Sequence, residues 1–186
     1  RLQSTIKDLN TIGTEAQVMK MLKMPDGNLT VIIQGRKLMQ LNELVQTDPF
    51  LKATVTEIPE LKPKSDDKEF IGLVDSIKEI ALQIAKESPN IPTEAQIAIK
   101  NIESPSFLVN FVCSNMDVEV KKKQELLQIA DLKKRSILTL ELLTKELQRL
   151  EMKNEIQHKV KHDLDQQQRE YFLNQEINSN MKKIAE

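Results

Sequence analysis

The hydrophobic pattern of the first 60 residues is that of short strands. Two apolar runs, "TEAQVMKML" and "NLTVIIQGRK", flank "MPDGN", and a Pro-Asp-Gly-Asn cluster between such runs predicts a tight hairpin. A third β-rich run, "KATVTEIPE", ends at Pro59. In the second run Leu29, Val31 and Ile33 alternate with their neighbours, but Ile32 interrupts the polar side. This strand is therefore expected to be covered on both faces.

The spacing becomes helical after the charged linker "ELKPKSDDKE", residues 60–69. The apolar residues that follow recur every three or four positions, as on one face of an amphipathic helix. They are Phe70, Val74, Ile77, Ala81 and Ile84. Ser65 or Asp66 is expected to cap this helix. Further on, Ser104 before Pro105 predicts a helix start, with Phe107 and Phe111 stacked one turn apart.

The last third of the chain predicts one long helix. Residues 117–186 contain neither Gly nor Pro, and leucines recur at helical spacing from Leu140 onward. With one break near Asp131, a helix of about 55 residues would be about 80 Å long. A compact domain of this size has a radius of gyration of about 16 Å. The helix is therefore expected to protrude from its domain.

These patterns predict an α+β fold in three parts. Residues 1–62 would form a small antiparallel β-subdomain, residues 63–130 a helical bundle, and residues 131–186 a very long helical or coiled-coil arm. The chain begins "RLQSTIKDLN", without Met or an apolar leader. We therefore expect an interior start and a β-subdomain that is incomplete at its N-terminal side.

Composition excludes several classes of partner. The net charge is -1 with a pI near 6.3, which favours neither nucleic acid nor anionic lipid as a partner. No apolar run approaches the roughly 20 residues that a membrane helix needs. The single cysteine, Cys113, excludes an internal disulfide and lies in the apolar run "FLVNFVC", which predicts a buried side chain. The expected location is the cytoplasm.

Catalytic patterns are missing from the sequence. None of the four glycines belongs to a phosphate-binding loop, and there is no Gly-x-Ser-x-Gly motif. His158 and His162 lie one helical turn apart with Asp165 nearby, but structural zinc needs four ligands. We expect these histidines to be solvated, with no catalytic residue, metal or cofactor in this chain.

Two groups of residues are candidates for binding. Met19, Met21 and Met24 precede the hairpin turn, and Met39 follows it. Methionines fill gaps in cores, and they also form adaptable apolar surfaces for varied partners; both interpretations stay open. The second group is Arg169, Tyr171, Phe172 and Leu173, in a polar stretch of the long helix.

Three stretches resemble one family in order along the chain. Residues 8–37, "DLNTIGTEAQVMKMLKMPDGNLTVIIQGRK", resemble the β-part of the amino-terminal domain of bacterial Lon proteases. Residues 65–135 resemble its helical part. Residues 142–177 resemble its long helix, whose Gln-Arg-Glu-Tyr-Phe-Leu run is the most specific signature. Two features depart from the family: its first strands have no counterpart in these residues, and "NSNMKKIAE" differs from the usual continuation.

The resemblance implies a function for the parent protein. Lon proteases are homohexameric, ATP-dependent serine endopeptidases with an AAA+ module and a Ser-Lys dyad, and they degrade misfolded and regulatory proteins. ATP and Mg would bind in modules outside this chain. This chain would select unfolded or damaged substrates and support assembly. The Tyr171–Phe172 pair would then pack against a neighbouring subunit or the ATPase ring, or against the segment that follows it in its own chain.

Two other classes of function fit the residues without the resemblance. One is a non-catalytic coiled-coil scaffold that uses the long helix. The other is a chaperone-like holdase that uses the methionine-rich surface with no protease attached.

Overall fold

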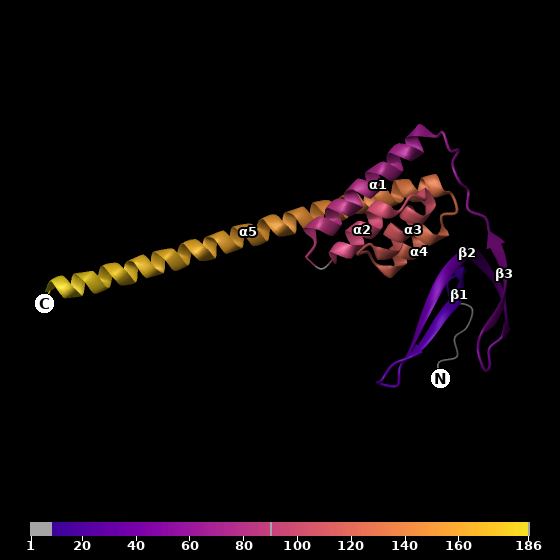
Figure 1. Ribbon diagram of the computed structural model, residues 1–186, viewed down its shortest axis with the longest axis horizontal. Helices are drawn as coiled ribbons and strands as arrows, with labels where there is room; N and C mark the ends of the chain where they lie inside the picture. The colour runs from indigo at the N-terminus through magenta and orange to yellow at the C-terminus, as the bar shows by residue number, and fades with distance from the viewer. Residues whose placement is uncertain (1–8, 90, 186) are drawn as a thin grey trace. The chain divides into compact units, whose positions relative to one another are not determined.

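The computed structural model describes residues 9–89 and 91–185, which form a three-stranded antiparallel sheet followed by five helices (Figure 1). The strands are β1 (Ile12–Lys23), β2 (Leu29–Gln46) and β3 (Lys52–Ile58). The helices are α1 (Lys68–Glu87), α2 (Thr93–Asn101), α3 (Pro105–Asn115), α4 (Val120–Gln128) and α5 (Leu132–Ala185). The predicted α+β fold with a long C-terminal helix is confirmed.

The sheet has the strand order β1-β2-β3. β1 pairs with β2 from Lys23↔Leu29 beside the turn to Ile12↔Gln40, which confirms the predicted hairpin. β3 pairs with β2 only from Leu38↔Ile58 onward. The tip of the first hairpin is therefore a two-stranded ribbon in the described part of the chain.

The expectation that this strand is covered on both faces is wrong within the described residues. Leu29, Val31, Ile32 and Ile33 are 61%, 42%, 47% and 61% exposed. The continuous apolar run does indicate a strand with two apolar faces, but β3 does not reach this half of β2 and no described element covers it. Ile32 and its neighbours thus produce an exposed apolar ribbon.

The chain divides into two compact units. One comprises residues 1–77 with 102–140, and the other residues 78–101 with 141–186. The core of the first is formed chiefly by α3, α4 and the start of α5, with Leu108, Val109, Val112, Leu126 and Leu132 at most 4% exposed. In the second, Ala81, Ile84, Ala85, Ile99 and Leu143 are buried. The predicted apolar face of α1 is confirmed, although Val74 is only half-buried.

The helix starts show which capping predictions were correct. The backbone N–H of Phe70 donates to Asp67 Oδ1 at 3.0 Å, so Asp67 caps α1 in place of the expected Ser65 or Asp66. Asp67 is also held by Lys133, a contact between distant parts of the sequence that local pattern does not indicate. Ser104 caps α3 as predicted, with its Oγ 3.3 Å from the Phe107 nitrogen.

Helix α5 is the long helix that the sequence predicts. The expected break lies between Gln128, where α4 ends, and Leu132, where α5 begins. Its 54 residues correspond to a length of about 80 Å at 1.5 Å per residue. Every side chain in residues 155–178 is exposed. This stretch of α5 therefore has no packed partner within residues 9–89 and 91–185.

Candidate functional site

The turn between β1 and β2 is fixed by its own polar atoms. Gly27 has φ 87°, a left-handed conformation that glycine adopts without a steric penalty. Its N–H donates to the Met24 carbonyl at 3.0 Å, and the Asn28 N–H donates to Asp26 Oδ1 at 3.0 Å. The bond from the Asn28 N–H is the main reason that the pKa of Asp26 is lowered. The turn thus orients the two strands that meet at the tip.

A β-bulge lies in β1 close to this turn. Val18 pairs with Ile33 and Lys20 pairs with Ile32, so Met19 is an extra residue with no partner of its own on β2. Because the bulge shifts the alternation by one residue, Val18 and Met21 fall on the same face of the hairpin. Strict alternation from the sequence would have placed them on opposite faces.

The two strands and their turn expose apolar side chains on both faces of the hairpin, and we name these side chains together the hairpin surface. It consists of Val18, Met19, Met21, Leu22, Met24, Leu29, Val31, Ile32 and Ile33. Met19 and Met21 are 57% and 64% exposed, and Met24 is 43% exposed. An exposed apolar patch of this kind marks a site for protein or ligand contact. The interpretation of these three methionines as core fillers has no support in the described residues.

Met39 does not belong to the hairpin surface. It lies farther along β2, where Gly13 of β1 and Glu57 of β3 flank it, and it is half-buried. The structure therefore brings together three of the four candidate methionines. Met39 stays a prediction for which the geometry offers no common surface with the others.

The four candidate residues of α5 are all exposed. Tyr171 and Phe172 are 60% and 65% exposed. Their rings meet edge to face with centroids 6.0 Å apart, and Gln175 Nε2 donates to Tyr171 Oη at 2.8 Å. Leu173 is 57% exposed, and Arg169 is exposed as well. These contacts are local to one helix, so the side chains are available to a partner.

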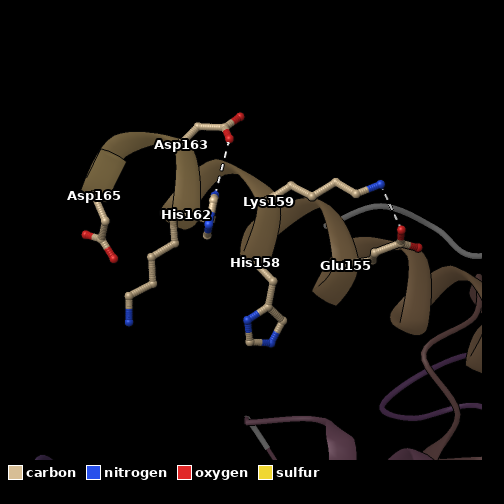
Figure 2. A pocket seen from close by; sticks show the side chains of 7 residues that line it. Glu155, His158, Lys159, His162, Asp163 and Asp165 are labelled. Atoms are coloured by element: carbon tan, nitrogen blue, oxygen red, sulfur yellow. Dashed lines mark ion pairs between the residues drawn. The ribbon is translucent and has the colours of Figure 1, made fainter. Parts of the chain in front are cut away.

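The histidines lie along a shallow, open hollow on one stretch of α5 (Figure 2). His162 Nδ1 is 3.7 Å from Asp163 Oδ1, and Lys159 Nζ forms an ion pair with Glu155 at 2.8 Å. This ion pair lowers the pKa of Glu155 and raises that of Lys159. In the described residues, no group of three His, Cys, Asp or Glu side chains has a geometry that could hold a metal ion. Exposed side chains from one helix do not form an enclosed site.

Cys113 is buried, as the sequence predicts. Its Sγ is 3.1 Å from Thr139 Oγ1, and burial raises the pKa of the thiol. Because the thiolate is the reactive form, burial and the raised pKa both lower the reactivity of this cysteine.

Sequence reasoning missed a buried polar cluster at the start of α5. Arg135 is 6% exposed and contacts Glu60 and Asn110. The signal that could have found it is helical spacing, since Arg135 lies three residues after Leu132 and four before Thr139. Both neighbours are buried, so an arginine between them faces the core.

Comparison with known families agrees with the fold and with the motifs. The family model described as the ATP-dependent protease La (LON) substrate-binding domain matches residues 2–145. The chain belongs to this family. The Lon protease of Flavobacterium johnsoniae is 56% identical over 170 residues, which cover 91% of this chain and 21% of that protein. The Lon protease of Karelsulcia muelleri is 46% identical over 175 residues, covering 94% of this chain and 20% of that protein.

This chain spans about a fifth of the length of these curated Lon proteases. The solved N-terminal domain of the Mycobacterium avium complex Lon protease has a TM-score of 0.60 at 18% identity, over 72% of this chain and 70% of that chain. At this identity the likeness supports the fold alone. None of the helices in residues 9–89 and 91–185 combines the length and apolar composition needed to cross a membrane.

Proposed function

We propose that this chain is the substrate-selecting region of an ATP-dependent Lon protease and that the hairpin surface binds unfolded polypeptides. The observation that carries the proposal is the exposure of nine apolar side chains on one hairpin in a Lon substrate-binding domain. Unfolded proteins differ from folded ones in exposing apolar side chains, which such a surface would bury on contact. Unbranched methionine side chains adapt to varied sequences, so binding would be broad.

The rest of the proposal concerns the whole protein. The parent would be a cytoplasmic, homohexameric serine endopeptidase that degrades misfolded and regulatory proteins. ATP with Mg and the Ser-Lys dyad would belong to modules outside this chain. Residues 1–62 would select substrates. Residues 63–130 would form a helical bundle that supports residues 1–62, and residues 131–186 would form a helical arm. Arg169, Tyr171, Phe172 and Leu173 would pack against a neighbouring subunit or the ATPase module.

Nuclear magnetic resonance titration tests the substrate proposal. A permanently unfolded model protein, reduced and carboxymethylated, is added to the isotope-labelled chain while backbone amide shifts are followed. We expect shifts on β1 and β2. Replacing Met19, Met21 and Met24 together by Ser should weaken binding at least tenfold, because each exposed methionine contributes apolar area to the contact.

The matched control is Met152→Ser with Met181→Ser on α5. Both control methionines are 64% exposed, as is Met21, so each control substitution removes as large a fraction of exposed methionine surface as Met21→Ser does. Binding should stay unchanged in this control. Shifts confined to the helices, or equal loss in both variants, would contradict the proposal.

A degradation assay with the full-length protein separates the holdase alternative. A holdase keeps an unfolded protein soluble without ATP, whereas a Lon region delivers it for degradation. In the full-length protein, the triple methionine variant should lose degradation of the unfolded protein but keep cleavage of short peptides. Equal loss of both activities would place the methionines in assembly and not in selection.

A further inference from the structure

Glu60 lies two residues after β3, and both of its carboxylate oxygens are engaged by the helices. Arg135 Nη2 donates to Glu60 Oε1 at 2.6 Å, and Ser106 Oγ donates to Glu60 Oε2 at 2.7 Å. Arg135 Nη1 donates to Asn110 Oδ1 at 2.7 Å. We name Glu60, Ser106, Asn110 and Arg135 the latch. It joins the end of the sheet to α3 and to the first turn of α5.

Backbone hydrogen bonds beside the latch also join the segment after β3 to the start of α5. The Leu61 N–H donates to the Ala130 carbonyl at 3.0 Å, and the Leu132 N–H donates to the Leu61 carbonyl at 3.0 Å. Leu61 and Asp131 thus form an isolated parallel bridge. The Leu61 side chain is 59% exposed, so Leu61 is held by its backbone hydrogen bonds and not by apolar burial.

A buried ion pair is a poor way to gain stability alone. Well-packed apolar residues of the same volume are often as stable or more so, whereas removal of one charge leaves the other uncompensated. The side chain of Arg135 is 7% exposed and that of Glu60 is 23% exposed. Arg135 Nε has no hydrogen-bond partner among the described residues, so even this cluster is incompletely satisfied. What such a pair does supply is a defined geometry, because its hydrogen bonds hold the two segments that carry the charges in one relative position.

We propose that Glu60 and Arg135 are positioning residues that make the sheet and the first turns of α5 unfold and refold locally as one cooperative unit. A polypeptide bound at the hairpin surface would then alter the backbone environment of the first turns of α5, residues 132–140, through Glu60 and Arg135. This second step rests on the proposed function, while the first depends only on the chain itself. The polar side-chain tether between Gln124 Nε2 and the Ile12 carbonyl, at 2.8 Å, also links the sheet to a helix, but it reaches α4 and carries no charge.

Hydrogen exchange tests the first step without any substrate. In the wild-type chain the amides of Leu61 and of Thr139, which lies inside α5, and those of β2 paired with β3 should share one opening free energy and one urea dependence. Glu60→Gln should make the β2 and β3 amides exchange at least tenfold faster than the Thr139 amide. The control is Glu57→Gln, which removes an ion pair with Lys37 of the same 2.6 Å length within the sheet. Exchange in this control should stay concerted.

A double variant distinguishes positioning from simple stabilisation. Glu60→Gln with Arg135→Met removes both charges, so the global urea midpoint should return toward the wild-type value while the sheet and α5 still exchange separately. Concerted exchange in both latch variants, or the same separation in Glu57→Gln, would overturn the proposal.

The second step is tested with the unfolded model protein. Its binding should shift the amides of residues 132–140 in the wild-type chain and in Gln124→Ala, but not in Glu60→Gln. Shifts of residues 132–140 that persist in Glu60→Gln would overturn this step and leave substrate binding intact. Absence of any binding would refute the proposed function, while the exchange result on the latch would stand.

Discussion

Lys133 Nζ lies 2.8 Å from Asp67 Oδ2, so the first turn of α5 is tied to the cap of α1. The same ammonium lies 2.6 Å from Glu69 Oε2. Asp67 contacts both helices, since its other oxygen accepts the Phe70 N–H of α1 at 3.0 Å. The Lys133 bond and then the Phe70 bond lower the pKa of Asp67, and the bonds to Asp67 and Glu69 raise that of Lys133.

The Asp67–Lys133 pair predicts an acid-dependent loss of stability. Because the pKa of Asp67 is below 3.8 in the folded chain, its contribution is present above that value and is lost as the pH falls through the lowered pKa. Asp67→Asn keeps a helix-capping side chain but removes the charge. Urea midpoints should show the variant less stable than wild type at pH 6, and the gap should close toward pH 2.

A gap that stays constant from pH 6 to pH 2 would show that the carboxylate charge is unimportant. The Lys133 ammonium makes the stability of the chain depend on pH at the alkaline end as well. Its raised pKa means that its contribution is present below 10.5 and is lost as the pH rises through the folded value.

Two glycines should respond to alanine with opposite signs. Gly27 has φ 87°, so Gly27→Ala forces an alanine into a left-handed conformation and should cost about 1–2 kcal/mol. Gly72 lies inside α1, and nothing lies within 4 Å of an added Cβ. Gly72→Ala should therefore stabilise the chain by about 0.5–1 kcal/mol. Chemical unfolding measures both, and a stabilising Gly27→Ala would contradict the turn geometry.

The thiol of Cys113 should react only after unfolding. Its side chain is buried and its pKa is raised, so both access and thiolate population are low. Labelling by a maleimide at pH 7 should be at least a hundredfold slower than after addition of urea. Moving the thiol one position, by Cys113→Ser with Ser114→Cys, places it on the exposed side of α3 and should restore fast labelling. Equal rates for the two native proteins would contradict the burial.

Tyr171 and Phe172 should be dispensable for the stability of this chain. Tyr171→Ala with Phe172→Ala removes two exposed rings, so the melting temperature should stay within about one degree of wild type. Leu143→Ala, on the same helix at 2% exposure, should instead cost about 2–5 kcal/mol. In the full-length protein the double variant should weaken assembly, as measured by sedimentation. Strong destabilisation of the isolated chain would place the pair in a core of its own.

Local pattern predicted the parts of the fold that depend on neighbouring residues. The Pro25–Asn28 turn, the Ser104 cap and the apolar face of α1 each follow from side chains a few positions apart, and all are present. The long helix follows from the missing Gly and Pro after residue 117. These features are set by backbone preferences that one segment carries alone.

Features that depend on distant contacts were not predictable in this way. Asp67 caps α1 in place of Ser65 or Asp66, and Lys133, 66 residues away, holds its second oxygen. The bulge at Met19 depends on pairing with β2, and Glu60 and Arg135 meet across 75 residues. Met19, Met21 and Met24 cluster in sequence and lie on the same hairpin tip, whereas Met39 lies farther along β2 and is half-buried. A single sequence indicates which residues are unusual, but not which distant residue each one meets.

Residues 155–178 of α5 are exposed to solvent. Their helix content therefore depends on the helix–coil equilibrium of this stretch and not on packing. Side-chain pairs one turn apart, such as Glu155 with Lys159 at 2.8 Å, each favour the helix by only about 0.2–0.5 kcal/mol. On warming, this stretch would shorten gradually, before the packed units melt. The reach of α5 is thus a property that temperature sets continuously, and a docked neighbour would fix it at full length.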